Sequence, residues 1–523
     1  MQRFLLKLNL LFLLAFAGTV FNCNKTIAAT QENELPREAL KILDTLPNNK
    51  LSLDVVIQQA LLASDHFKEI KANFIKLPSS VLMAKSPLDV QTYIQGIRSL
   101  NKNETASPFS PTNTSVTQYT LGASTYFSTG TALSAEITHG YNLIGFATTN
   151  DLDYFETSGT LSLTQNLWKD SFGYSTRLGV TAGTLQQKAA EFQLDNSIED
   201  WMDSIIKVFY QSKLAQDQTR AARANVKRKQ RLYKITTLKN KRGTAEKPDL
   251  IQVKSALTHS EIDATNTKQS LIEVWRYLVT SLKFPESWLD INPMLIPLEL
   301  DSPTNKALNY CGDASNLRPT PKDTALTQML KNQLATAELK LKQAQNIAKP
   351  ETQLILSLNS NGMDSSRGET WGETFGLDHP NWSVGLKFSV PLFNYESEAN
   401  IRNALSAHEQ IQAKYSKEKS DLKVDWLNSC NNLFNKKRNT QKLKTSYLEQ
   451  LERNSLEEKR FQLGRIPVLS VIQAGDDATQ TEVALRKSEI ELKLAAWKIL
   501  KLSNLYKNYL TELKTKKLIQ IKE

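Results

Sequence analysis

The chain has 523 residues, a formal net charge of +11 and 23% charged residues, with only 19 glycines and 17 prolines. This length allows about three or four ordinary domains, but the sparse glycine and proline favour long, solvent-exposed helices over several packed globules. The positive charge does not indicate nucleic-acid binding, because basic and acidic residues are interleaved as on a solvated helix face. The densest basic run, from Lys227 to Arg231, is therefore interpreted as exposed helix surface.

The N-terminus has the pattern of an export signal. Arg3 and Lys7 precede an apolar run that ends at Val20, and small residues follow at Ala28 and Ala29. A basic start, a short apolar core and small residues at the cleavage site predict a secretory signal peptide over residues 1–29. A lipid anchor on Cys23 is the less favoured alternative and stays open, because Asn22 is a poor fit to the small residue that lipid processing prefers.

Two cysteines remain if Cys23 is removed with the signal. Cys311 and Cys430 lie far apart in the sequence and in different expected elements. In an exported protein they could form a disulfide, but their separation favours two free buried thiols.

The first half of the chain combines strands with a very long helix. Residues 51–64 have apolar residues at helical spacing, and a stretch rich in Ser, Asn, Pro and Thr follows at 101–117. Alternation of period two between residues 119 and 168 predicts strands, which we count as two. Residues 184–241 contain no proline and predict a helix of about 90 Å, which a glycine turn joins to a returning helix over 249–283.

The second half has the same order of elements. A helix over 324–349 stops at Pro350, and strands are expected at 352–358 and 382–390. A second proline-free helix over 397–463 turns at Gly464 and returns from residue 468 to 508.

The two halves share landmarks at nearly one offset. The stop at Leu167 recurs at Leu392 (392 − 167 = 225), and Gly243 recurs at Gly464 (464 − 243 = 221). Such agreement predicts a duplicated unit. The expected units are a first repeat over 30–284, a proline-bearing connector over 285–321, a second repeat over 322–508 and a basic tail over 509–523.

No pattern of an enzyme or a cofactor site stands out. The five histidines are scattered without metal-binding spacing, and phosphate-binding loops, Cys-x-x-Cys and nucleophile elbows are missing from the sequence. We therefore expect no catalytic residues, no bound metal and no cofactor.

Two features resemble the outer-membrane efflux protein family, the TolC-like channel-tunnels. The first is a helix that ends in proline, then a strand, and then a strand that closes on Pro-Leu-Phe, here Ala348-Lys349-Pro350, LILSL and WSVGLKFSVPLF. The second is an aromatic residue, a glycine and a helix with spaced apolar residues, here Phe461 to Ala474. Weaker copies of both occur in the first half, so the resemblance covers nearly the whole mature chain.

The resemblance implies an α+β membrane protein in the bacterial outer membrane. With four strands per protomer, three copies would close a twelve-stranded β-barrel, continuous with a long α-helical barrel in the periplasm. The expected function is the exit duct of a tripartite efflux pump or a type I secretion system. Its expected partners are two further copies of the chain, a periplasmic adaptor, an inner-membrane transporter and outer-membrane lipid, with no nucleic acid.

The resemblance also places the working end at the glycine turns. Gly243, Pro248, Gly464 and Pro467 are the expected periplasmic tip turns and adaptor-docking positions. Asp249, Ser470 and Gln473 occupy the expected constriction, but two of these three positions are neutral, which departs from an acidic gate. Arg465 and Asp476 are further candidates for tip contacts.

Two other functions stay open at this point. A periplasmic adaptor also carries long helical hairpins, although one hairpin is usual, and an exported coiled-coil structural protein could carry the strands as a soluble cap. The sequence leaves the transported substrate and the cognate pump unspecified.

Overall fold

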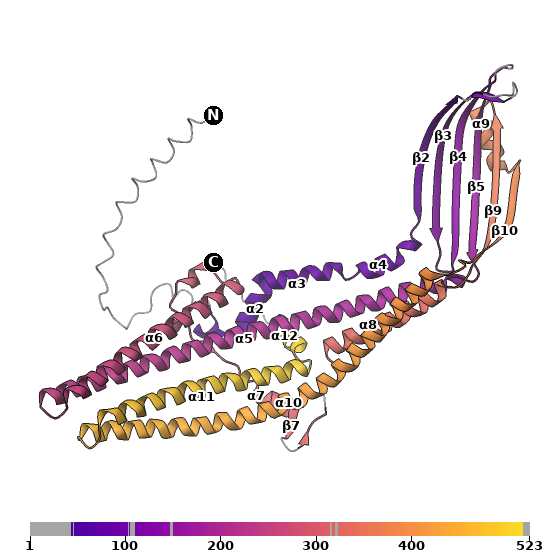
Figure 1. Ribbon diagram of the computed structural model, residues 1–523. Helices are drawn as coiled ribbons and strands as arrows, with labels where there is room; N and C mark the ends of the chain where they lie inside the picture. Colours follow the sequence, from indigo (N-terminus) through magenta and orange to yellow (C-terminus); the bar gives the residue numbers. More distant parts are fainter. Residues whose placement is uncertain are drawn as a thin grey trace, which may run out of the picture.

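The structure is a computed structural model that describes residues 43–44, 46–102, 104, 110–146, 150–313, 316–319 and 323–515. It consists of a long helical rod with a single large β-sheet at one end (Figure 1). The expected signal peptide over 1–29 lies outside the described residues. In the described ranges, none of the helices is long and apolar enough to cross a membrane.

Two helical hairpins form most of the rod. The first consists of α5 (Tyr174–Lys241) and α6 (Lys247–Ser281), and the second of α10 (Tyr395–Gln462) and α11 (Val468–Leu502). In each hairpin the first helix has 68 residues and the second has 35. At 1.5 Å per residue the longer helices extend over about 100 Å.

Shorter helices fill the rod between the hairpins and the sheet. α8 (Ala325–Ile347) lies along both α5 and α10, and α4 (Ser79–Lys85) packs on α5. Beside the sheet the rod therefore has four helical columns, formed by α4, α5, α8 and α10 (Figure 1). The remaining helices are α2 (Leu53–Ala63), α3 (Asp65–Lys76), α7 (Thr304–Cys311), α9 (Arg367–Gly376) and α12 (Tyr506–Thr515).

A buried core holds the middle of the rod together. Indole Nε1 of Trp275 donates to the carbonyl of Trp288 at 2.8 Å, and Nε1 of Trp497 donates to the Tyr210 hydroxyl at 3.0 Å. A parallel pair between β1 (Leu51–Ser52) and β6 (Leu298–Glu299) joins the start of α2 to the connector. The Trp497–Tyr210 bond thus joins the two hairpins, and the other contacts join the connector to α6 and to the start of α2.

The sheet has six antiparallel strands in the order β10-β9-β5-β4-β3-β2. Its strands are β2 (Gln91–Lys102), β3 (Pro111–Tyr126), β4 (Thr131–Phe146), β5 (Leu152–Asn166), β9 (Glu351–Asp364) and β10 (Pro380–Ser389). The predicted count of four strands per protomer is wrong, because the described residues form a sheet of six. The twelve-stranded barrel built on that count stays a prediction. The first half contributes four strands because β2 lies in a segment for which no strand was predicted, and because the alternating segments between residues 119 and 168, counted as two strands, belong to β3, β4 and β5.

The two faces of this sheet differ in polarity. Residues that pair across neighbouring strands point to the same face, so each row of paired residues belongs to one face. One row across all six strands is Thr92, Ala123, Ala135, Leu161, Leu358 and Trp382. The adjacent row, on the opposite face, is Tyr93, Gly122, Glu136, Thr160, Asn359 and Asn381. We call these the apolar face and the polar face of the sheet.

Cys311 and Cys430 form a disulfide, with Cα atoms 5.7 Å apart. The expectation of two free thiols is therefore wrong. The connector folds back along the second hairpin, so that α7 packs on α10 and α11 and brings the distant cysteines together. The distance between the two cysteines in the sequence therefore did not indicate their distance in the fold.

Candidate functional site

The end of each hairpin is a tight turn that needs glycine for its backbone conformation. Gly243 and Gly464 have φ angles of +73° and +74°, in the left-handed region that other residues rarely adopt. A Cβ atom at either position would meet no other atom within 4 Å, so space does not impose the glycine. Pro248 lies in the first turn of α6, and Pro467 is the residue before α11.

The two tips pack on each other through an apolar cluster. Leu232 and Val253 of the first hairpin meet Phe461, Val468 and Ile472 of the second, and all five are buried. Separating the hairpins at this end would expose these side chains to water, so the cluster favours the closed arrangement.

Basic residues of α5 bind the second hairpin just behind this cluster. The Lys229 ammonium donates to the Asp476 carboxylate at 2.9 Å and to the Ile472 carbonyl at 3.1 Å. Arg228 Nη2 donates to the Thr479 hydroxyl at 2.7 Å. We call the Lys229–Asp476 pair the hairpin clasp.

The interpretation of the basic run as exposed surface is therefore wrong for one residue. Lys229 is only 3% exposed, whereas Lys227 and Arg231 are on the surface. Asp476 was a candidate for tip contacts and makes one, while Arg465 is exposed. The sequence carried no signal that singled out Lys229, because five polar residues in a row conceal which of them points inward.

The three constriction candidates have different surroundings. Asp249 belongs to the capping box of α6, in which its carboxylate accepts the Glu246 backbone N–H at 3.4 Å. Ser470 is half-buried on α11, and Gln473 is exposed. The structure thus gives Asp249 a local role at the helix start, and its role in a constriction stays a prediction.

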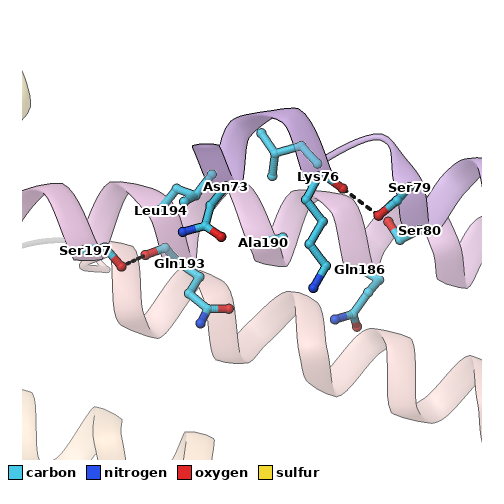
Figure 2. A pocket seen from close by; sticks show the side chains of 10 residues that line it. Asn73, Lys76, Ser79, Ser80, Gln186, Ala190, Gln193, Leu194 and Ser197 are labelled. Atoms are coloured by element: carbon cyan, nitrogen blue, oxygen red, sulfur yellow. Dashed lines mark hydrogen bonds between the residues drawn. The ribbon is translucent and has the colours of Figure 1, made fainter. Parts of the chain in front are cut away.

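The helical rod also has shallow grooves. One of about 350 Å³ lies between α3, α4 and α5, and Figure 2 shows Lys76 extending over it between Gln186 and Gln193. Within the described ranges, no group of three or more His, Cys, Asp or Glu side chains is placed to hold a metal ion.

Comparison with solved structures identifies this architecture. The outer-membrane channel OprN superposes with a TM-score of 0.63 at 14% identity, covering 92% of this chain and 98% of that one. The outer-membrane protein VceC of Vibrio cholerae gives 0.62 at 13% identity, with 86% and 96% covered. The Campylobacter jejuni channel CmeC gives 0.62 at 13% identity, with 94% and 97% covered.

The chain has the fold of an outer-membrane channel. The resemblance inferred from the proline and glycine patterns is thus confirmed at the level of the fold. No protein-family model matches the sequence, and no curated protein matches it.

Proposed function

We propose that this protein is an outer-membrane channel that conducts substrates from the periplasm to the exterior. The observation that carries the proposal is the apolar face of the sheet, which the chain leaves uncovered on its edge strand. Trp382 is 76% exposed and Leu386 is 70% exposed, although such side chains are normally buried in a soluble protein. Lipid would cover this face, and the polar face would line a water-filled bore.

The sheet edges support assembly from several copies. β2 and β10 are the two edges of the sheet, and they run in opposite directions, so β10 of one copy can pair with β2 of the next as an antiparallel neighbour. An open edge cannot lie in lipid because its backbone groups would lose their hydrogen bonds. We propose three copies, which give eighteen strands.

The helical hairpins would then form a periplasmic tube that ends at the glycine turns. A periplasmic adaptor would bind the tips and join the channel to an energised inner-membrane transporter, in an efflux pump or a type I secretion system. Conduction through the tube itself would be passive. Opening would separate the hairpins at the apolar cluster and the hairpin clasp, as a shift between closed and open populations, and Asp249 would face the constriction.

The disulfide supports export. Cys311 and Cys430 are paired and fully buried, and such bonds persist in oxidising compartments such as the periplasm.

The first test is the detergent-corrected mass of the protein extracted from outer membranes. We expect the mass of three mature chains, each below the 59.0 kDa of the full chain because the signal peptide is removed. A monomer that stays soluble without detergent would overturn the proposal and favour the adaptor or the coiled-coil structural protein.

A further inference from the structure

A short helix covers part of the sheet at the end farthest from the helical rod. This helix, α9, lies in the connection between β9 and β10 and packs on β9 and β5 (Figure 1). The helix packs on the strands, so one of its sides faces the sheet and the other faces outward.

The helix lies on the apolar face of the sheet. Its contacts are with His139, Phe155 and Thr157, and these residues lie on the same face of the sheet as Ile137 and Leu161. Between β5 and β9 the paired residues at this level are small or polar, since Gly159 pairs with Ser360 and Thr157 with Gly362. On these two strands the apolar pair of Leu161 and Leu358 thus gives way to small and polar pairs where α9 packs, and Phe155 is the exception.

The packing of α9 is specific. Thr370 Oγ1 and Thr157 Oγ1 lie 2.8 Å apart, and Thr374 Oγ1 donates to the Thr157 carbonyl at 2.8 Å. A Cβ atom on Gly362 would lie 2.4 Å from the Thr370 carbonyl oxygen, so only glycine lets the helix approach this closely. The helix therefore covers the sheet at this level and forms hydrogen bonds with Thr157, while the buried Ser360 hydroxyl has no hydrogen-bond partner among the described residues.

Two aromatic side chains of α9 itself are exposed. Trp371 is 38% exposed and Phe375 is 64% exposed, and their rings stack with centroids 5.9 Å apart. Trp382 is exposed nearby, at the start of β10. Exposed aromatic rings at the end of an apolar band mark the boundary between lipid headgroups and acyl chains.

We infer that α9 is a membrane-interface helix, which inserts the Trp371 and Phe375 rings into the headgroup boundary of the outer leaflet. The inference rests on the proposed function, because it needs the apolar face to lie in lipid. α9 adds apolar side chains to that face over β5 and β9, where most of the paired strand residues are small or polar. It thereby keeps the polar sheet groups beneath it away from lipid.

A neighbouring copy of the chain is the competing occupant of this surface. α9 sits on β9 and β5, whereas the edge available to a neighbour is β10. β10 starts at Pro380, which pairs with Ser360, so it does not extend to the level of Gly362 where α9 packs. The exposed and stacked rings of Trp371 and Phe375 are what favour lipid over a neighbouring copy.

The test measures the depth of single labels in proteoliposomes. A Cys23→Ser background leaves only the disulfide-bonded cysteines, so an environment-sensitive fluorophore can be attached at Phe375→Cys. Matched labels are placed at Leu386→Cys on the apolar face and at Lys387→Cys on the polar face. Nitroxide-bearing phosphatidylcholines, with the nitroxide either near the headgroup or deep in the acyl chain, then quench the labels.

We expect at least twofold stronger quenching at Phe375→Cys than at Lys387→Cys, with the shallow nitroxide more effective than the deep one. Quenching at Leu386→Cys without quenching at Phe375→Cys would overturn the interface helix and leave the channel proposal intact. Deep quenching that exceeds shallow quenching at Phe375→Cys would also overturn it. If neither label is quenched, the apolar face does not meet lipid and the proposed function fails.

Discussion

At the scale of single residues, the hairpin clasp is unusual because one of its two charges is buried. Lys229 has almost no contact with solvent, whereas the Asp476 side chain is about half exposed, at 52%. Removing the carboxylate would leave a buried ammonium with only a carbonyl partner, which costs several times more than losing the pair itself. Removing the lysine would leave a carboxylate that water can solvate.

We therefore predict that Asp476→Asn raises single-channel conductance or open probability in planar bilayers by about twofold or more, because the uncompensated charge drives the hairpins apart. Lys229→Met and the double variant Lys229→Met/Asp476→Asn should stay close to wild type. Wild-type conductance for Asp476→Asn would show that the clasp does not hold the tip closed.

In the same bilayers, an increase for Asp249→Ala would support a constriction role, and no change would leave Asp249 a helix cap.

A second buried charge lies on the same helix. The pKa of Glu199 is raised to about 7, mainly by burial in the core of the rod; the nearby ammonium groups of Lys501 and Lys507 oppose this shift, and the carboxylates of Asp195 and Asp200 add to it. In the unfolded chain the carboxyl ionises near its usual value of 4.5. Stability is therefore highest below about pH 4.5 for this group, falls as pH rises toward 7, and is lower by a constant amount above it.

We predict that Glu199→Gln stabilises the protein at pH 8 by about 3 kcal/mol per chain, which corresponds to about 3 °C in the melting temperature of a protein this size. Most of this gain should disappear at pH 5. Thermal melts in detergent at both pH values measure it, with Glu191→Gln on the exposed side of α5 as the control. Equal gains at pH 5 and pH 8 would contradict a raised pKa.

At the scale of elements, the disulfide attaches the connector covalently to the second hairpin. It closes a loop of 119 residues and joins α7 to α10. A crosslink over a loop this long restricts the unfolded chain strongly and typically contributes about 2–4 kcal/mol.

We predict that Cys311→Ala/Cys430→Ala lowers the melting temperature by about 2–4 °C in detergent. Denaturation in the presence of a reductant should lower the wild-type value by a similar amount and leave the variant unchanged. A reductant effect of equal size in both proteins would assign the loss to some other cause.

The helices could be predicted from the sequence more completely than the strands. Proline-free stretches and the glycines at 243 and 464 are local signals, and the predicted hairpins agree with the structure except at two ends. α5 begins ten residues before position 184, at Tyr174, and α11 ends at Leu502 instead of residue 508. A strand depends on its neighbours, so no strand was predicted at the polar start of β3. The contacts of Lys229 and of the cysteine pair depend on the packing of distant segments, which no local pattern records.

At the scale of the whole molecule, six strands match the rod better than four. Four helical columns about 10 Å wide cover an arc of about 40 Å per protomer. Six strands spaced about 4.8 Å apart and tilted by about 40° cover about 37 Å, whereas four would cover only about 25 Å. A sheet of six strands can therefore continue the wall of a helical tube without a step in diameter.

The last prediction concerns which strand closes the barrel between copies. If all six strands belong to the barrel, β10 of one copy pairs with β2 of the next. If β2 and β3 fold outside it, β10 would pair with β4. Ser383 on β10, Gln95 on β2 and Ser134 on β4 all point to the polar face, so thiols at these positions can be compared directly.

We expect a short bifunctional thiol reagent to link Ser383→Cys/Gln95→Cys chains into covalent dimers and trimers in outer membranes, while Ser383→Cys/Ser134→Cys chains stay monomeric on denaturing gels. Because the shear of a closed barrel shifts the register between copies, Ser99→Cys serves as a second position on β2. Crosslinking through Ser134→Cys alone would show that the barrel has four strands per copy. Crosslinking through β2 would establish a bore about 1.5 times wider than twelve strands provide, since barrel diameter grows roughly in proportion to strand number.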